Sequence, residues 1–160
     1  MYTFRAFITN YWLISAASGW FLAQIFKIFT GFFKEQNFTL RALFFGTGGM
    51  PSSHTAAVCA LSTSFAVREG FGSPLFAITS VFAIVVMIDA MGVRRETGKQ
   101  SRALNLIVEE LFSSNPEEFN LRFKELIGHT PLQVFFGMLT GIATAIVLSF
   151  VPVFAALPVV

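Results

Sequence analysis

Charge is scarce in this chain. Only 12% of its 160 residues are Asp, Glu, Lys or Arg, about half of the quarter that is usual in soluble domains. So few polar side chains would leave the surface of a water-soluble domain largely apolar, whereas a lipid bilayer accepts such a surface directly. The scarcity of charge therefore excludes an ordinary soluble domain and favours an integral membrane protein.

Cysteine is almost absent as well. The single cysteine, Cys59, excludes an internal disulfide framework, and its apolar neighbours favour a small buried side chain. The net charge is +2, but the Lys and Arg residues are scattered between apolar runs and form no basic stripe. We therefore expect no nucleic acid as a partner.

Apolar residues make up 54% of the chain, and 21 of them are Phe. Runs of about 20 apolar residues are long enough to cross a bilayer as helices. We expect an all-α fold, an integral membrane helical bundle of about four spanning helices in one transmembrane domain that covers 1–160. The expected spans are about 6–33, 52–67, 73–93 and 131–155, with a re-entrant or interfacial segment at 34–50 and a surface insertion at 94–128 that carries short helices at 103–112 and 116–127.

Four spans alternate in direction, so the end of the first, the start of the second, the end of the third and the start of the fourth share one membrane face. Nine Lys and Arg residues belong to that face and two to the other. The positive-inside tendency then predicts that this face is cytoplasmic. The nine are Lys27, Lys34, Arg41, Arg94, Arg95, Lys99, Arg102, Arg122 and Lys124, and the two are Arg5 and Arg68.

The string from Gly48 to Thr55 is the most informative on that face. Gly48, Gly49 and Pro51 lead into a helix whose first turn carries Ser52, Ser53 and His54. Free N–H groups at a helix start bind phosphate oxygens, the two hydroxyls add donors, and the imidazole can protonate a leaving alkoxide. The alternative is a plain helix cap by one of the serines.

A second histidine, His129, starts another helix, and Gln133 follows one turn later on the same face. An imidazole can attack phosphorus and form a phosphohistidine. A capping or interfacial histidine is the alternative for His129 taken alone. The chain has only two histidines, and both lie at helix starts on the same face, which favours a functional site.

Cations near that face complete the candidate site. Arg94 and Arg95 suit a phosphoryl group, although interfacial anchoring is the alternative, and Asp89 is expected to pair with one of them. Lys27 lies two-thirds along the first apolar run, where it either snorkels to the interface or points into a polar cavity.

Taken together, these residues resemble the type 2 phosphatidic acid phosphatase superfamily, and most closely its divergent branch related to acid phosphatases and vanadium-dependent haloperoxidases. The superfamily has three motifs, K-x6-R-P, P-S-G-H and S-R-x5-H-x3-D. Pro51-Ser52-Ser53-His54 matches the second with serine in place of glycine, and His129 to Val134, with Gly137 beyond, resembles the end of the third. The resemblance to the divergent branch covers nearly all of the chain.

The resemblance implies a membrane lipid-phosphate phosphatase that transfers a phosphoryl group to water through a phosphohistidine, with no cofactor and no metal ion. His129 would attack phosphorus, His54 would protonate the lipid alcohol, and Gln133 would orient His129. The substrate-binding candidates are Lys27, Arg41, Ser52, Ser53, Arg94, Arg95 and Lys124, and Asp89, Gly48, Gly49 and Pro51 are expected to be structural.

Two departures from the motifs leave an alternative open. Phe123 stands where the third motif has serine, so Arg94 or Arg95 is expected to replace the motif arginine. Gln133 stands where the carboxylate is expected, and an amide can fix a ring but cannot stabilise an imidazolium by charge. The alternative function is a non-catalytic protein that binds or transports phospholipid head groups. Expected partners are a phosphorylated lipid and the bilayer, in a bacterial plasma membrane or a plastid membrane, with a homodimer left open.

Overall fold

The computed structural model describes residues 4, 7–30, 50–111 and 128–155. Within these residues the chain is helical and contains no strand, which confirms the predicted all-α fold class. The helices are α2 (Tyr11–Phe29), α4 (Ser53–Glu69), α5 (Pro74–Met91), α6 (Val93–Leu111), α7 (Pro131–Ser149) and the short α8 (Pro152–Ala155).

Local sequence sets where these helices begin. Asn10, Ser52, Ser73 and Thr130 are the N-caps of α2, α4, α5 and α7, and each side chain accepts a hydrogen bond from a backbone N–H in the first turn. In α5 and α7 a proline follows the cap, where its missing N–H costs nothing. Helix α7 ends at Ser149 and α8 begins at Pro152, so the helix is interrupted just before a proline, which cannot continue the backbone hydrogen bonding.

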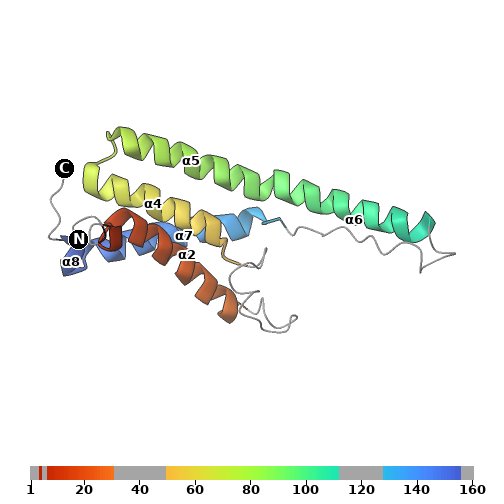
Figure 1. Ribbon diagram of the computed structural model, residues 1–160, viewed down its shortest axis with the longest axis horizontal. Coiled ribbons are helices and arrows are strands. Elements are labelled where there is room, and N and C mark those ends of the chain that lie inside the picture. Colours follow the sequence, from red (N-terminus) through yellow and green to blue (C-terminus); the bar gives the residue numbers. More distant parts are fainter. Residues whose placement is uncertain (1–3, 5–6, 31–49, 112–127, 156–160) are drawn as a thin grey trace.

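Helix α4 lies in the middle of the bundle and packs against α2, α5 and α7 (Figure 1). Small residues allow this close approach. A Cβ atom added to Gly19 of α2 would lie 2.9 Å from the carbonyl oxygen of Ala56, and one added to Gly141 of α7 would meet the same oxygen. Gly137 approaches the backbone of Ser52 in the same way. Gly137 and Gly141 therefore form a small-residue packing face on α7.

In the part of the chain that the structure describes, three helical segments are long and apolar enough to cross a membrane, namely Tyr11–Phe29, Pro74–Leu111 and Pro131–Ser149. Large apolar side chains of α5 point away from the bundle, for example Ile78, which is 64% exposed, and lipid is the solvent that such a surface needs. Helix α4 is not among the three. Neighbouring helices surround it, so its exposed residues are few and its composition can be rich in Ala and Ser. Its span remains a prediction.

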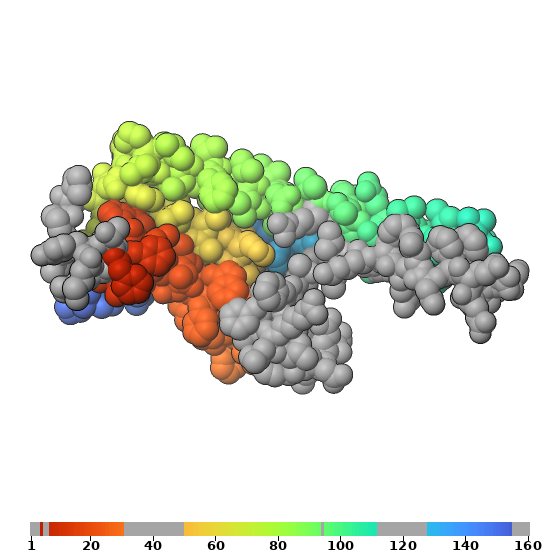
Figure 2. All heavy atoms as spheres, in the orientation of Figure 1, coloured from red at the N-terminus to blue at the C-terminus, as the bar shows by residue number. Residues whose placement is uncertain are grey.

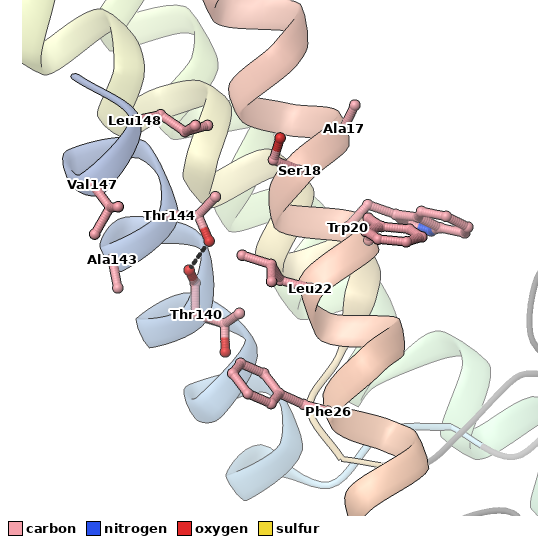
Figure 3. A pocket seen from close by; sticks show the side chains of 11 residues that line it. Ala17, Ser18, Trp20, Leu22, Phe26, Thr140, Ala143, Thr144, Val147 and Leu148 are labelled. Carbon is pink, nitrogen blue, oxygen red and sulfur yellow. Dashed lines mark hydrogen bonds between the residues drawn. The ribbon is translucent and has the colours of Figure 1, made fainter. Parts of the chain in front are cut away.

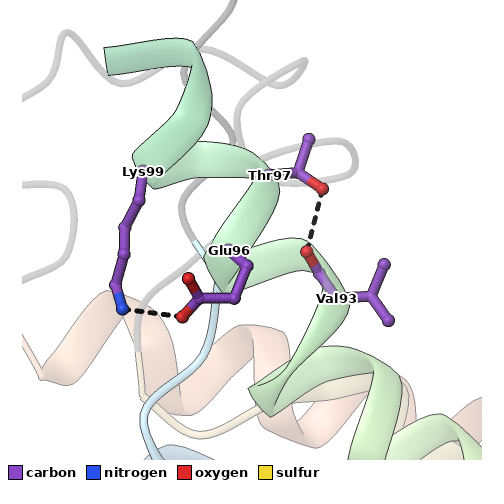
Figure 4. A network of polar contacts seen from close by, with 4 residues as sticks. All are labelled: Val93, Glu96, Thr97 and Lys99. Atoms are coloured by element: carbon purple, nitrogen blue, oxygen red, sulfur yellow. Dashed lines mark hydrogen bonds and ion pairs between the residues drawn. The ribbon is translucent and has the colours of Figure 1, made fainter. Parts of the chain in front are cut away.

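Helix α6 differs from the expected surface insertion with a short helix at 103–112. It is one helix of 19 residues, Val93–Leu111, separated from α5 by Gly92 alone. It continues in the direction of α5 beyond the end of α4 (Figures 1 and 2). Its first turns are stabilised by an ion pair of 2.6 Å between Glu96 and Lys99 and by the hydroxyl of Thr97, which donates to the carbonyl of Val93 (Figure 4). The segments expected at 34–49 and 116–127 lie outside the described residues.

Candidate functional site

Four helix ends meet at one end of the bundle, as the alternation of spans predicts. The ammonium group of Lys27, in the last turn of α2, donates to Ser53 Oγ at 3.3 Å. The backbone N–H of Ser52 donates to the carbonyl of Gln133 in α7 at 2.9 Å. The backbone N–H of His129 donates to the carbonyl of Ala90, in the last turn of α5, at 3.0 Å. These three hydrogen bonds tie α2, α4, α5 and α7 together where the candidate residues lie.

Lys27 points into the bundle. The buried face of α2 repeats every four residues, through Tyr11, Ser15, Gly19 and Ala23 to Lys27. Lys27 itself is only 2% exposed. Of the two roles predicted for this lysine, the geometry favours a charge directed to a polar contact over a snorkelling side chain.

The serines at the start of α4 have different surroundings. Ser52 Oγ accepts from the backbone N–H of Thr55 at 3.4 Å and from the Thr55 hydroxyl at 3.0 Å, so Ser52 is the helix cap. Ser53 is buried and faces Lys27. His54, the next residue, is exposed in the first turn. The contact between Ser53 and Lys27 joins this helix start to a predicted cation.

The hydrogen bonds of Gln133 determine the tautomer of His129. Gln133 Oε1 accepts from the backbone N–H of Thr130 at 2.9 Å, which identifies this amide atom as the oxygen. The same oxygen lies 3.2 Å from Nδ1 of His129. An amide oxygen can only accept, so Nδ1 carries the proton, and in the neutral ring Nε2 keeps the lone pair. The ring of His129, which is 6% exposed, is thus held in one orientation.

Gln133 also has a structural role that the sequence interpretation missed. Thr130 and Gln133 form a reciprocal capping box at the start of α7, because the Thr130 hydroxyl accepts from the N–H of Gln133 at 3.4 Å. The spacing Thr-x-x-Gln at a helix start is the signal that would have revealed it. One side chain therefore both caps the helix and positions the histidine.

The arginines lie at the start of α6. Arg95 is exposed, and its backbone occupies the space into which a side chain on Gly128 would project, so Gly128 lies close to α6. The backbone of Arg94 lies in α6, but its side chain is outside the described part, so the expected pairing with Asp89 stays a prediction. Asp89 lies in the last turns of α5 and is half-buried.

The remaining predicted residues divide into two groups. Pro51 is buried directly before α4 and follows a cis peptide bond from Met50. Residues outside the described part of the chain are Arg41, Lys124, Gly48 and Gly49.

Positive charge gathers at this end of the bundle, which favours an anion. Helices α4 and α7 both begin there, and the free N–H groups of each first turn contribute partial positive charge. Lys27 adds a full charge in a buried position. Among the residues that the structure describes, His, Cys, Asp and Glu side chains form no group of three that could hold a metal ion.

The fold and this site define a helical membrane protein with a lysine, serines and two histidines gathered at one end of its bundle. Residues 8–144 match the family model described as "Divergent PAP2 family", and the chain belongs to that family. It is 40% identical over 153 residues to the "Uncharacterized membrane protein YuiD" of Bacillus subtilis (strain 168), an alignment that covers 89% of this chain and 96% of the relative. No solved structure matches the chain at a significant level.

Proposed function

We propose that this protein is a lipid-phosphate phosphatase that transfers a phosphoryl group to water through a phosphohistidine at His129. The observation that carries the proposal is the bridge from the Thr130 N–H through Gln133 Oε1 to His129 Nδ1, because a proton on Nδ1 makes Nε2 the nucleophilic nitrogen of the neutral ring. Membership of the divergent PAP2 family and the buried charge of Lys27 support it.

In the proposed reaction, His129 Nε2 forms a bond to phosphorus while the bond from phosphorus to the lipid oxygen breaks. His54 protonates the departing alkoxide, which leaves as the lipid alcohol. Water then attacks the phosphohistidine and gives its proton to His54, so inorganic phosphate leaves and both histidines return to their starting forms. Lys27, Ser53 and the arginines would hold the phosphoryl oxygens, whose charge is the main target of catalysis in phosphoryl transfer.

Phosphate release from phosphatidic acid in detergent micelles tests the proposal. The wild-type protein should release phosphate and, after an acid-free quench, carry a labelled histidine when the substrate phosphate is radioactive. His129→Asn should lose both signals, while His54→Asn should still form the labelled intermediate with an activated leaving group that needs no protonation, such as p-nitrophenyl phosphate. Absence of phosphate release from every lipid phosphate in a panel would refute the proposal.

Gln133 favours a second candidate, a non-catalytic protein that binds phospholipid head groups. An amide orients His129 but gives no negative charge to stabilise the imidazolium, and here the same amide caps α7. Under this reading the protein should bind vesicles that contain phosphatidic acid more tightly than vesicles of phosphatidylcholine, without releasing phosphate. Binding should weaken in Lys27→Met.

We further propose that the site faces the cytoplasm. The support is the predicted distribution of nine Lys and Arg residues on the site face against two on the other. A phosphatase in this orientation would act on a lipid phosphate in the cytoplasmic leaflet.

A further inference from the structure

A groove runs along the outside of the bundle between α2 and α7. Its volume is about 750 Å³, within the size range of small-molecule sites, and every residue that lines it belongs to one of these two helices (Figure 3). Leu22 and Phe26 line it from α2, and Ala143, Val147 and Leu148 line it from α7.

The two threonines that line the groove direct their hydroxyl groups to the backbone of α7. Thr144 donates its hydroxyl proton to the carbonyl of Thr140 at 2.7 Å, as Figure 3 shows. Thr140 donates in turn to the carbonyl of Phe136 at 2.8 Å. Both threonines therefore use their protons within α7, and an apolar ligand meets no unsatisfied donor from them.

One end of the groove adjoins the candidate site. Phe26 is the residue before Lys27, whose ammonium group contacts Ser53. Across the groove, Thr140 lies one turn after Gly137, whose backbone touches Ser52. The groove is thus apolar along its length and cationic just beyond one end.

The length of the groove fits one leaflet. The lining residues extend from 17 to 26 in α2 and from 140 to 148 in α7, which is about 12–14 Å at 1.5 Å per residue. Half of the hydrocarbon core of a bilayer is about 15 Å thick. Both helices are apolar enough to span, so lipid chains rather than water are the medium around the groove.

We infer that this groove binds one acyl chain of the lipid whose phosphate group lies at Lys27 and His129. The inference rests on the proposed lipid-phosphate specificity and adds how the lipid is held. An amphiphile with an apolar chain and an anionic head matches the groove and the cation at its end. The face of a second protein copy would match only the apolar part.

The first test fills the groove. Ala143→Phe places a ring in it, and Val85→Phe, on the exposed face of α5, is the matched control. For long-chain phosphatidic acid, KM should rise about tenfold in Ala143→Phe and stay unchanged in Val85→Phe. For dihexanoyl phosphatidic acid, whose chains are too short to fill the groove, both variants should behave like wild type. Equal effects on both substrates, or none on either, would overturn the inference.

The second test needs no turnover. In phosphatidylcholine vesicles, a phosphatidic acid probe with a diazirine in the middle of one chain should label 17–26 and 140–148 preferentially, and Ala143→Phe should remove this labelling. Groove labelling without any phosphate release would preserve the inference and refute the phosphatase. Equal labelling by a phosphatidylcholine probe, or equal labelling of α5, would refute the inference itself.

Discussion

Among the residues that the structure describes, one cation is buried at each end of the bundle, and the two are held in different ways. At the end away from the site, Arg68 is 8% exposed, lies 4.8 Å from the centre of the Tyr11 ring and donates to the carbonyl of Phe154. The Tyr11 hydroxyl donates to the carbonyl of Ala145 at 2.8 Å. At the site, Lys27 is 2% exposed and contacts the neutral hydroxyl of Ser53 at 3.3 Å.

The difference separates a structural cation from the one that we propose to be functional. Arg68 joins α4 to α2 and α8 through an aromatic ring and a backbone carbonyl, two kinds of contact that suit a planar guanidinium. Lys27 has a compact ammonium group near two helix N-termini, where a phosphate would improve its surroundings. Burial alone therefore does not identify a functional charge; the partners around it do.

Replacing the site lysine should give the largest effect. Lys27→Met removes the buried charge but keeps an unbranched side chain of similar length, so the fold should persist. Phosphate release should fall about 10²–10³-fold, as for the loss of one preorganised transition-state contact. The control is Lys99→Met, which removes an exposed lysine paired with Glu96 and should leave turnover unchanged. Normal activity in folded Lys27→Met would contradict the functional role that we propose for this lysine.

Replacing Arg68, at the other end of the bundle, should lower the stability of the protein and leave its activity unchanged. Arg68→Met loses the contact with Tyr11 and leaves the carbonyl of Phe154 without its charged donor. Unfolding in detergent should become easier by about 2–4 kcal/mol. The protein that remains folded should keep the wild-type kcat. A fall in kcat at unchanged stability would instead place Arg68 in the functional machinery.

A smaller effect is expected when Gln133, which orients His129, is replaced by glutamate. Gln133→Glu keeps the length that both the capping box and the His129 contact require, and it adds a charge that favours the imidazolium. We expect phosphate release to rise about tenfold. Gln133→Asp is the matched control, because its shorter side chain cannot keep both contacts. Unchanged or lower turnover in folded Gln133→Glu would favour the head-group binding function.

The two ends can also be assigned to membrane sides without changing activity. In a Cys59→Ala background, Gln100→Cys places a thiol on exposed α6 beyond the site, and Gly72→Cys places one in the exposed turn between α4 and α5. A membrane-impermeant thiol reagent added to intact cells should label position 72 only. Labelling at position 100 before permeabilisation would contradict the cytoplasmic assignment.

Much of this arrangement could be predicted from local sequence. The expected span at 73–93 became α5 at Pro74–Met91, and the expected span at 52–67 became α4 at Ser53–Glu69, because caps and prolines mark these ends. The meeting of Lys27, Ser53 and His129 at one end followed from alternation of direction. Such features depend on residues that are close in sequence or on topology alone.

The rest depends on contacts between distant residues. Arg68 looked like a charge at the end of a span, and only its position beside Tyr11, far away in the sequence, reveals a structural role. The length of α6 was missed because Gly92 and two arginines resemble the end of a helix, whereas one glycine does not stop the helical direction here. Only the three-dimensional structure reveals that the amide oxygen of Gln133 contacts two donors.

The small residues of α4 have a consequence for biogenesis. Helix α4 packs closely against Gly19, Gly137 and Gly141 and is not itself among the strongly apolar helices. Insertion of α4 into lipid is therefore only weakly favourable while those partners are missing. The helix that brings two of these glycines, α7, follows α4, α5 and α6 in the chain. During translation α4 therefore stays without its complete set of packing partners until α7 has been made. Ser53 and His129 can come together only when α7 packs against α4, so a chain made only as far as α6 has no assembled site.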